Sequence, residues 1–179
     1  MLLYNKSLDI RVPTGYRDIS DMIAAKMYQY MFVCDQDNYD DFLIIDLMEP
    51  KEQIDLHIEE IMDMNEIKQP KLLLVEYSTS QFAKSLNIFA NKYKCRGVPR
   101  EVEWPSDSQP WACVHIIGEI ARSDGKPRQV NVLIGISKYQ MSDIVISMFR
   151  EGELALEKKE DFFHMVQTVE VIDPSIFVP

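Results

Sequence analysis

The alternation of apolar and polar residues along the chain predicts mostly β-structure. Residues 8–13 place Leu8, Ile10 and Val12 between polar neighbours, which is the period of a half-buried strand. Later apolar runs of strand length are separated by turn residues, and one Asp-Gly pair supplies the positive φ angles that a tight hairpin needs. The remaining predicted strands are residues 28–34, 42–48, 71–80, 111–121, 128–137 and 144–149.

Apolar residues recur with the period of a helix in two segments. Within residues 52–67, Ile54, Ile58 and Ile61 fall on one face, and a proline marks the end of the helix before the next strand. Residues 153–168 repeat this period, with apolar side chains one and two turns apart. Both segments are therefore predicted to pack one apolar face against a sheet.

The segment 81–110 differs from the rest of the chain. Five Lys and Arg residues lie close together in it, followed by three prolines, which is typical of a long connection with one or two helical turns at residues 83–90. A short helix is also predicted at residues 20–25, where Ser20 can cap it. Hairpins with one helix near the middle and one at the end predict an α+β fold, a mostly antiparallel β-sheet flanked by helices. The length of 179 residues predicts a single domain.

Charge narrows the choice of partner. The chain has 19 Lys and Arg against 29 Asp and Glu, a net charge of −10. Such a surface repels nucleic acid and anionic membranes, because binding to either depends on Lys and Arg. No apolar run reaches membrane-spanning length and the N-terminus has no targeting pattern, so we expect a soluble intracellular protein. A basic protein is the natural complement, and the alternative is that the charge serves solubility alone.

Motifs for chemistry are missing from the sequence. It has no glycine-rich phosphate loop, no nucleophile elbow and no metal-ligand spacing, and its three cysteines are expected to be reduced. His57 is predicted to lie on a helix surface, where it forms at most a weak metal pair with Glu60, and His115 and His164 are expected to be structural. We expect no catalytic residues, no cofactor and no metal. The alternative, a small hydrolase, requires a pocket that gathers His57 or His115 with two carboxylates.

Acidic residues are concentrated in one part of the chain. Residues 35–66 contain twelve Asp and Glu but one lysine. We expect a contiguous negative patch made by the hairpin tip at 35–41, Glu49 and the exposed side of the 52–67 helix, although a merely solvated surface would look the same. Asp46 and Glu49 differ from the other acids because they interrupt and close an apolar strand, where a carboxylate must face solvent or find a partner.

Several segments, taken in order, resemble one protein family, the Mog-type Ran guanine-nucleotide release factors. After the opening strand, the spacing of Pro13, Gly15, Tyr16, Asp18 and Ser20 is similar to the family's start. Five further segments are similar to the family and follow in the same order: residues 29–33, residues 43–49, the hairpin with Gly125-Lys126-Pro127, the strand at 142–148 and the closing segment with Asp173 and Ser175. The resemblance does not include residues 81–110, approximately.

The resemblance implies both a fold and a function. The fold is the Mog/PsbP-like α/β/α sandwich, formed by a single domain over residues 1–179 with a family-divergent insertion at about 81–110. The function is binding of the Ran GTPase and promotion of guanine-nucleotide release, in the nucleus and the cytoplasm, in the regulation of nuclear protein import. We expect a monomer, with no nucleic acid or membrane partner.

One departure from the family affects the expected contact site. The family places an Asp and a Glu around the glutamine of one strand, and these are implicated in contacting Ran; here Met27 and Tyr30 stand around Gln29. We expect Met27 and Tyr30 to form a partly exposed apolar spot beside Gln29, or else to be buried. The acidic role then moves to Asp46, Glu49 and the hairpin, or the chain is an acidic interaction module with a different basic partner. The candidate binding residues are Met27, Gln29, Tyr30, Asp40, Asp41, Asp46 and Glu49.

Overall fold

The computed structural model describes residues 1–4, 6–22, 28–34, 41–95, 97–105, 108–121, 125–139 and 142–177. Its main element is an eight-stranded sheet in which neighbouring strands are antiparallel, except for one parallel pair at the edge. In order across the sheet, the strands are β3 (Tyr16–Asp18), β4 (Gln29–Cys34), β5 (Asp41–Met48), β10 (Asp143–Glu151), β9 (Pro127–Lys138), β8 (Trp111–Ala121), β6 (Lys68–Tyr77) and β7 (Arg100–Glu101).

Helices and a small second sheet complete the described structure. The helices are α1 (Asp55–Met64), α2 (Ala83–Lys92) and α3 (Leu156–Gln167), with short 3₁₀ turns at Ser20–Met22, Ser80–Phe82 and Pro174–Phe177. The small sheet consists of β1 (Leu2–Leu3), β2 (Leu8–Asp9) and β11 (Glu170–Val171). It therefore joins the beginning of the chain to the segment that follows α3.

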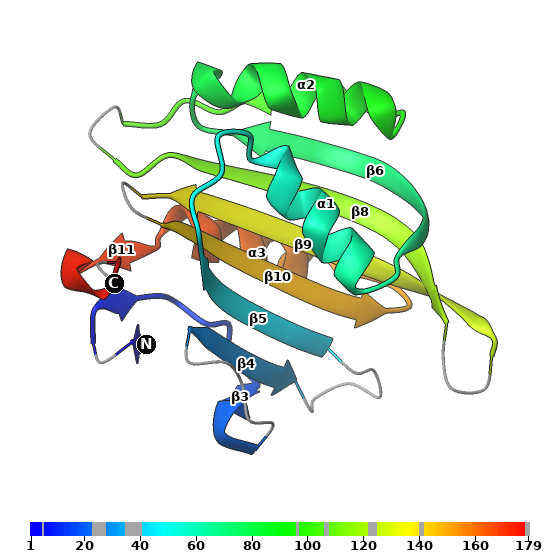
Figure 1. Cartoon of the computed structure of the whole chain (residues 1–179). Helices are drawn as coiled ribbons and strands as arrows, with labels where there is room; N and C mark the ends of the chain where they lie inside the picture. Colours follow the sequence, from blue (N-terminus) through cyan, green and yellow to red (C-terminus); the bar gives the residue numbers. More distant parts are fainter. Residues whose placement is uncertain are drawn as a thin grey trace.

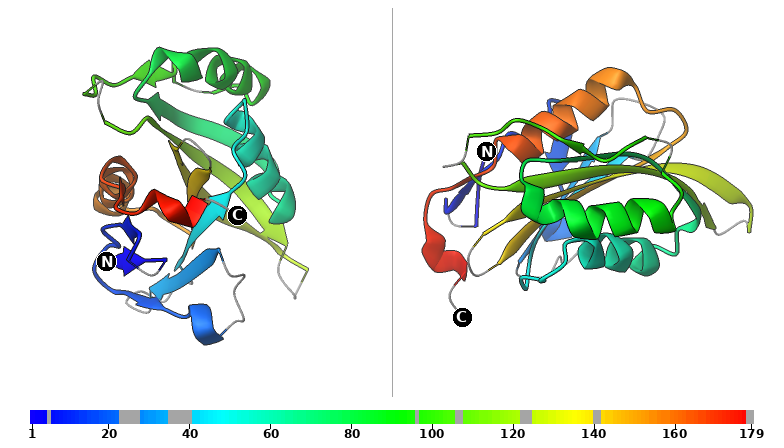
Figure 2. Two further views of the ribbon diagram at one scale, coloured as in Figure 1. Left: turned by 60° about the vertical axis from the view of Figure 1, so that its left-hand side comes forward. Right: turned by 90° about the horizontal axis from the view of Figure 1, so that it is seen from above.

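The helices lie on both faces of the large sheet. α1 and α2 cover one face, which we call the front (Figure 1), and α3 lies across the opposite face, the back, as both views in Figure 2 show. Each face has its own core of buried apolar side chains, and the small sheet contributes to the back core. This arrangement confirms the predicted α+β fold with a mostly antiparallel sheet flanked by helices.

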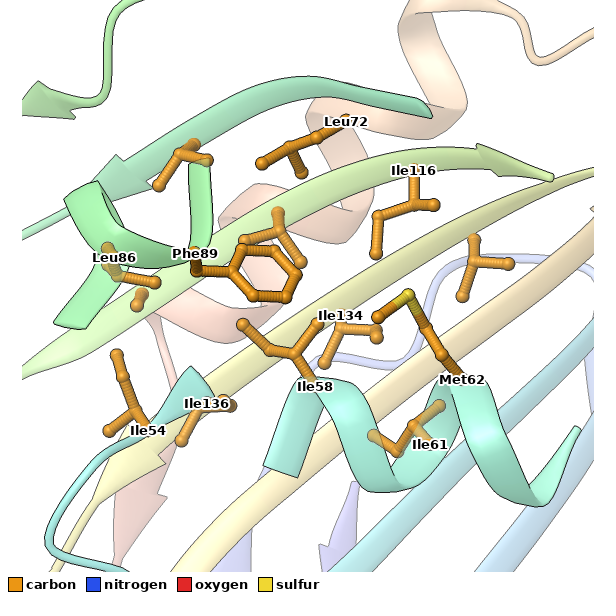
Figure 3. Packing of buried hydrophobic residues seen from close by; sticks show 14 of the residues in the cluster. Ile54, Ile58, Ile61, Met62, Leu72, Leu86, Phe89, Ile116, Ile134 and Ile136 are labelled. Carbon is orange, nitrogen blue, oxygen red and sulfur yellow. The ribbon is translucent and has the colours of Figure 1, made fainter. Parts of the chain in front are cut away.

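The front core is built from the apolar stripe that the sequence predicted. Ile58, Ile61 and Met62 of α1 are at most 8% exposed and point toward Phe89 of α2 and strand residues such as Ile134 (Figure 3). The periodicity at 52–67 is thus confirmed, with the regular helix limited to Asp55–Met64. Burial of these side chains holds α1 and α2 side by side over the sheet.

The back core depends on a close approach between α3 and β9. Phe162, Met165 and Val166 of α3 are buried, as the pattern at 153–168 predicted. A Cβ atom added to Gly135 would lie 2.1 Å from Cγ2 of Val166, far inside van der Waals contact. Any side chain at position 135 would therefore push α3 away from the sheet.

Two strand predictions need correction. Pro70 lies inside β6 rather than ahead of it. The register shifts between Lys68 and Lys71, and Gln69 has a φ of +49°, so the strand bulges here. The bulge accommodates Pro70, which has no N–H to donate to the neighbouring strand. The strand predicted at 8–13 is shorter than expected, because the pairing extends over Leu8–Asp9 alone.

The two shorter predicted helices have different outcomes. α2 confirms the helical turns expected at 83–90, and its Leu86 and Phe89 are buried in the front core, so this part of segment 81–110 belongs to the sandwich. That segment 81–110 is an insertion relative to the family stays a prediction. Of the helix expected at 20–25, the described part is the 3₁₀ turn Ser20–Met22, and residues 23–25 lie outside the described residues.

Candidate protein-interaction surface

Three rows of side chains on the front of the sheet extend past the helices that cover them. Residues that pair across neighbouring strands share one face, so each row can be followed from strand to strand. On β9, β8 and β6 these rows lie in the front core. On β4 and β5 they continue as three pairs whose side chains are half-buried: Gln29 with Asp46, Met31 with Ile44, and Val33 with Phe42. The last of these rows goes on to the exposed Arg17 of β3.

We call these six residues the open sheet face. α2 lies beside β6, α1 crosses in front of β8, β9 and β10, and no helix of the described ranges extends over β4 (Figure 1). Four of the six side chains are apolar and remain partly in contact with water. A contiguous apolar surface on a rigid sheet, bordered by polar residues, is typical of a protein-binding site.

A polar pair forms one end of the open sheet face. Nε2 of Gln29 donates a hydrogen bond to Oδ1 of Asp46 over 2.8 Å, across the β4–β5 ladder. This bond fixes the position of the carboxylate at the front of the sheet. Glu49, three residues further on, is exposed, and Tyr28 before β4 is 50% exposed. Two of the predicted residues, Gln29 and Asp46, are thus brought together at this end of the surface, and Glu49 follows the end of β5 beyond them.

Tyr30 is partly exposed, as expected, but it does not lie beside Gln29. Successive residues of a strand point to opposite faces, so Tyr30 turns to the back, where its ring meets that of Tyr4 at 4.8 Å. Its hydroxyl accepts a hydrogen bond from the Tyr4 N–H over 3.2 Å. Burial, together with the charge of Asp46, raises the pKa of Tyr4. The expected shared spot with Gln29 is wrong for Tyr30, and Met27 lies outside the described residues.

Asp41 is a second correction. It was expected on the exposed hairpin tip, but β5 begins at this residue and places it between β4 and β10, with its side chain 1% exposed. Its Oδ2 accepts hydrogen bonds from Arg150 over 2.6 Å and from Lys158 over 2.9 Å. A carboxylate that is buried and bound by two cations cannot contribute to an exposed patch. Asp40, its predicted neighbour in that patch, lies outside the described residues.

The acidic side of α1 is smaller than the composition indicated. Asp55 is buried, and this burial raises its pKa. Glu59 accepts a hydrogen bond from Lys92 over 2.5 Å, and Glu60 is paired with Lys51. The acids of this region that remain exposed are Glu49, Glu52, Asp63 and Glu66. The hairpin part of the predicted patch, at 35–40, lies outside the described residues.

The prediction that His57 lies on the helix surface is wrong. Its side chain is fully buried, and Nε2 lies 2.7 Å from Oδ2 of Asp143, which also accepts the Lys51 N–H over 3.0 Å. Lys138 places its ammonium group 3.4 Å from the other carboxylate oxygen. The pair ties the start of α1 to β10. The sequence held a signal for it, because position 57 falls within the apolar stripe of α1.

His115, which was expected to be structural, is also buried. Its Nε2 lies 2.9 Å from Oδ1 of Asn131, and burial lowers its pKa. Hollows of about 620, 320 and 300 Å³ indent the described surface, and no histidine lines them. The gathering of a histidine with two carboxylates in a pocket, which a hydrolase would require, is not found among the described residues. Within the same ranges, no three His, Cys, Asp or Glu side chains converge as metal ligands, and no helix is long and apolar enough to span a membrane.

The sequence matches no protein-family model and no curated protein. The fold, however, is similar to that of solved structures. The crystal structure of the Saccharomyces cerevisiae Ran-binding protein Mog1p has a TM-score of 0.66 and 17% sequence identity, and the match covers 99% of this chain and 97% of that chain. A glutamate-to-alanine mutant of protein Mog1 has a TM-score of 0.65, with the same identity and coverage. The Mog-type fold implied by the sequence resemblance is therefore confirmed.

Proposed function

We propose that this protein binds the Ran GTPase, promotes release of its guanine nucleotide and regulates nuclear protein import. In this proposal the protein is located in the nucleus and the cytoplasm. The observation that carries the proposal is the fold, which the chain shares over 99% of its length with a yeast Ran-binding protein. In this proposal the protein is a non-catalytic monomer that needs no cofactor and no metal. Its activity is binding itself.

The open sheet face supplies the contact in this proposal. Met31 and Ile44 would pack against apolar side chains of Ran, and Asp46, held by Gln29, would accept a hydrogen bond from a Lys or Arg at the edge. Exposed Glu49 would add to the attraction for a basic surface. In this proposal the contact is made from the front and does not involve Tyr30, the residue at the family's glutamate position, which faces the back.

Nucleotide release follows from differential affinity. A binding protein that prefers the nucleotide-free GTPase lowers the affinity of the GTPase for nucleotide by the same factor, because the two equilibria are linked. No bond is made or broken in this process. The protein therefore needs a rigid surface rather than a catalytic group, and a half-buried patch on a large sheet meets that need.

The test measures release of a fluorescent guanine nucleotide from Ran, with and without this protein. The wild type should accelerate release. Met31→Glu should weaken the effect most, by about tenfold or more, because it places a charge at the apolar centre of the contact. Asp46→Asn with Glu49→Gln should weaken it several-fold and flatten its dependence on salt.

The matched control is Asp161→Asn, which removes an exposed charge from α3 on the back of the sheet. This variant should release nucleotide as the wild type does. Thermal unfolding of each variant separates loss of contact from loss of fold. If the wild type does not accelerate release, the proposal is wrong; if Asp161→Asn weakens release as much as Asp46→Asn does, the contact is not on the open sheet face.

A second candidate function is an acidic interaction module for a different basic partner, without activity on Ran. It is favoured by Tyr30, which stands where the family has a glutamate and is turned toward Tyr4. Restoring both family acids, as Met27→Asp with Tyr30→Glu, distinguishes the two functions. Gain of release by this variant, with none by the wild type, would indicate that the chain has left the Ran pathway while keeping the scaffold.

A further inference from the structure

The surface around α2 has the opposite charge to the rest of the protein. Residues 77–100 contain five Lys and Arg and not one Asp or Glu, in a chain whose net charge is −10. α2 lies near β6, toward the far side of the sheet from β4 and the open sheet face (Figure 1). The basic segment is therefore separated from the surface proposed to bind Ran, and the inference below does not rest on that function.

α2 presents a regular stripe to solvent. Its buried side is formed by Leu86, Phe89 and Ala90, and the opposite side exposes four residues spaced as one helical face. These four residues are Lys84, Asn87, Ile88 and Asn91. Ile88 is 58% exposed and places an aliphatic side chain among the polar residues of this stripe.

A groove of about 300 Å³ lies alongside this stripe. Asn87 and Asn91 line it from the helix, Lys94 lines it just beyond the helix end, and Gly97 and Val98 line it from the segment that follows. Val98 is 86% exposed. The groove thus combines two side-chain amides, one ammonium group and an exposed aliphatic residue.

The Lys and Arg residues around α2 differ in whether they are already paired with an acidic residue. Lys92 is paired with Glu59, and Arg100 with Glu76. Lys84 and Lys94 have no acidic partner among the described residues. Asn87 uses one amide hydrogen on the Ala83 carbonyl over 2.7 Å and keeps its side-chain oxygen for another donor. Two cations and unspent amide groups therefore remain at the surface.

We infer that the α2 groove, together with the exposed stripe beside it that carries Lys84 and Ile88, binds an acidic peptide segment of a partner protein, with one apolar side chain placed between acidic residues. Lys84 and Lys94 would pair with the acids, the amides of Asn87 and Asn91 would bond the peptide backbone, and Ile88 with Val98 would cover the apolar residue. Eight residues of helical rise separate Lys84 from the end of α2 at Lys92 by about 12 Å, and Lys94 lies just beyond that end. An extended chain spans that distance with about four to five residues.

The observations favour a peptide over nucleic acid. Two lysines with free charge can neutralise few phosphates, and the net charge of −10 opposes a polyanion at every other surface. Nucleic acid also offers no use for the exposed aliphatic pair, Ile88 and Val98, beside the lysines. A short acidic segment with an apolar residue uses every group that the groove presents.

The test measures fluorescence anisotropy of labelled peptides with the full-length protein. The peptides carry two Asp-Glu pairs and a leucine between them, with the pairs separated by two, four or seven residues. We expect the peptide with four intervening residues to bind best. Lys84→Glu with Lys94→Glu should weaken binding by at least about tenfold, and Val98→Asp by several-fold.

The matched control is Lys6→Glu with Arg11→Glu, which changes the net charge equally at exposed positions away from α2. It should leave binding unchanged. The inference is overturned by an equal loss in both double variants, by equal binding of the Asn-Gln version of the peptide, or by failure of all three peptides to bind. Tighter binding of a single-stranded DNA of similar length would overturn it in favour of nucleic acid.

Discussion

Asp41 and Asp46 lie on the same strand, β5, and show two opposite uses of a carboxylate. The two side chains are an odd number of residues apart, so they lie on different faces of the sheet. Asp41 is buried at the back and bound by Arg150 and Lys158. Asp46 is half-buried at the front and is oriented by the neutral amide of Gln29. The difference shows that the charge of an acid-rich segment does not identify a binding surface; the face of the sheet and the burial of each side chain do.

The largest effect is expected when Asp41 is replaced. Asp41→Asn removes the buried charge that both Arg150 and Lys158 contact, and breaking a buried ion pair in this way costs about 3–5 kcal/mol of the free energy of unfolding. Asp46→Asn, the same change on the same strand, should cost less than about 1 kcal/mol. Urea unfolding measures both. Equal losses would mean that burial does not distinguish the two carboxylates.

A smaller effect is expected at Tyr30. Tyr30→Phe removes the hydroxyl that accepts the Tyr4 N–H and keeps the ring contact, which should cost about 1 kcal/mol of stability. Nucleotide release from Ran should be unchanged, because this side chain faces the back, away from Asp46. If this variant loses nucleotide release but keeps its stability, the contact with Ran lies at the back of β4 and not on the open sheet face.

The smallest effect is expected in the dependence of folding stability on pH, through His115 on the back of the sheet. Burial lowers the pKa of His115 below 6.5. The hydrogen bond to Asn131 opposes this shift, and the charge of Lys159 adds to it. The unfolded chain therefore takes up this proton at higher pH than the folded protein. The stability due to neutral His115 is complete above its ordinary pKa and is lost as the pH falls through the lowered one.

Thermal unfolding followed from neutral pH to about pH 5 tests this expectation. His115→Gln should flatten the fall in stability, whereas Asp46→Asn should leave the contribution of His115 in place. The Asn131 that contacts His115 is in register with Arg150, the counter-ion of Asp41, so the proton would enter beside an existing cation. An unchanged slope in His115→Gln would show that the acid response arises elsewhere.

Local pattern was sufficient for most of the fold and for part of the site. Strand alternation and helix periodicity located the β4–β5 pair, α1 and α3, because their apolar residues repeat at fixed spacing. Pro70 was misplaced because a bulge lets β6 continue through a proline. Asp41 was misplaced because it adjoins an acidic stretch of sequence, and composition cannot tell where in such a stretch a strand begins.

Contacts between distant parts of the chain could not be predicted from local pattern. The Gln29–Asp46 bond depends on the exact register of two strands, and Tyr30 meets a residue 26 positions earlier. His57 is a different case. Its place in the apolar stripe indicated burial, but the carboxylate that compensates for that burial, Asp143, is 86 positions away.

The close approach of α3 to Gly135 of β9 restricts the motion of the helix. Val166 fills the space that a side chain at 135 would occupy, and Lys158 near the other end of α3 is bound to Asp41. The helix is thus fixed at two points, and it cannot slide along the sheet without losing one of them. The strands beneath it are held in a single arrangement, so a partner that meets the open sheet face has little conformational entropy to remove.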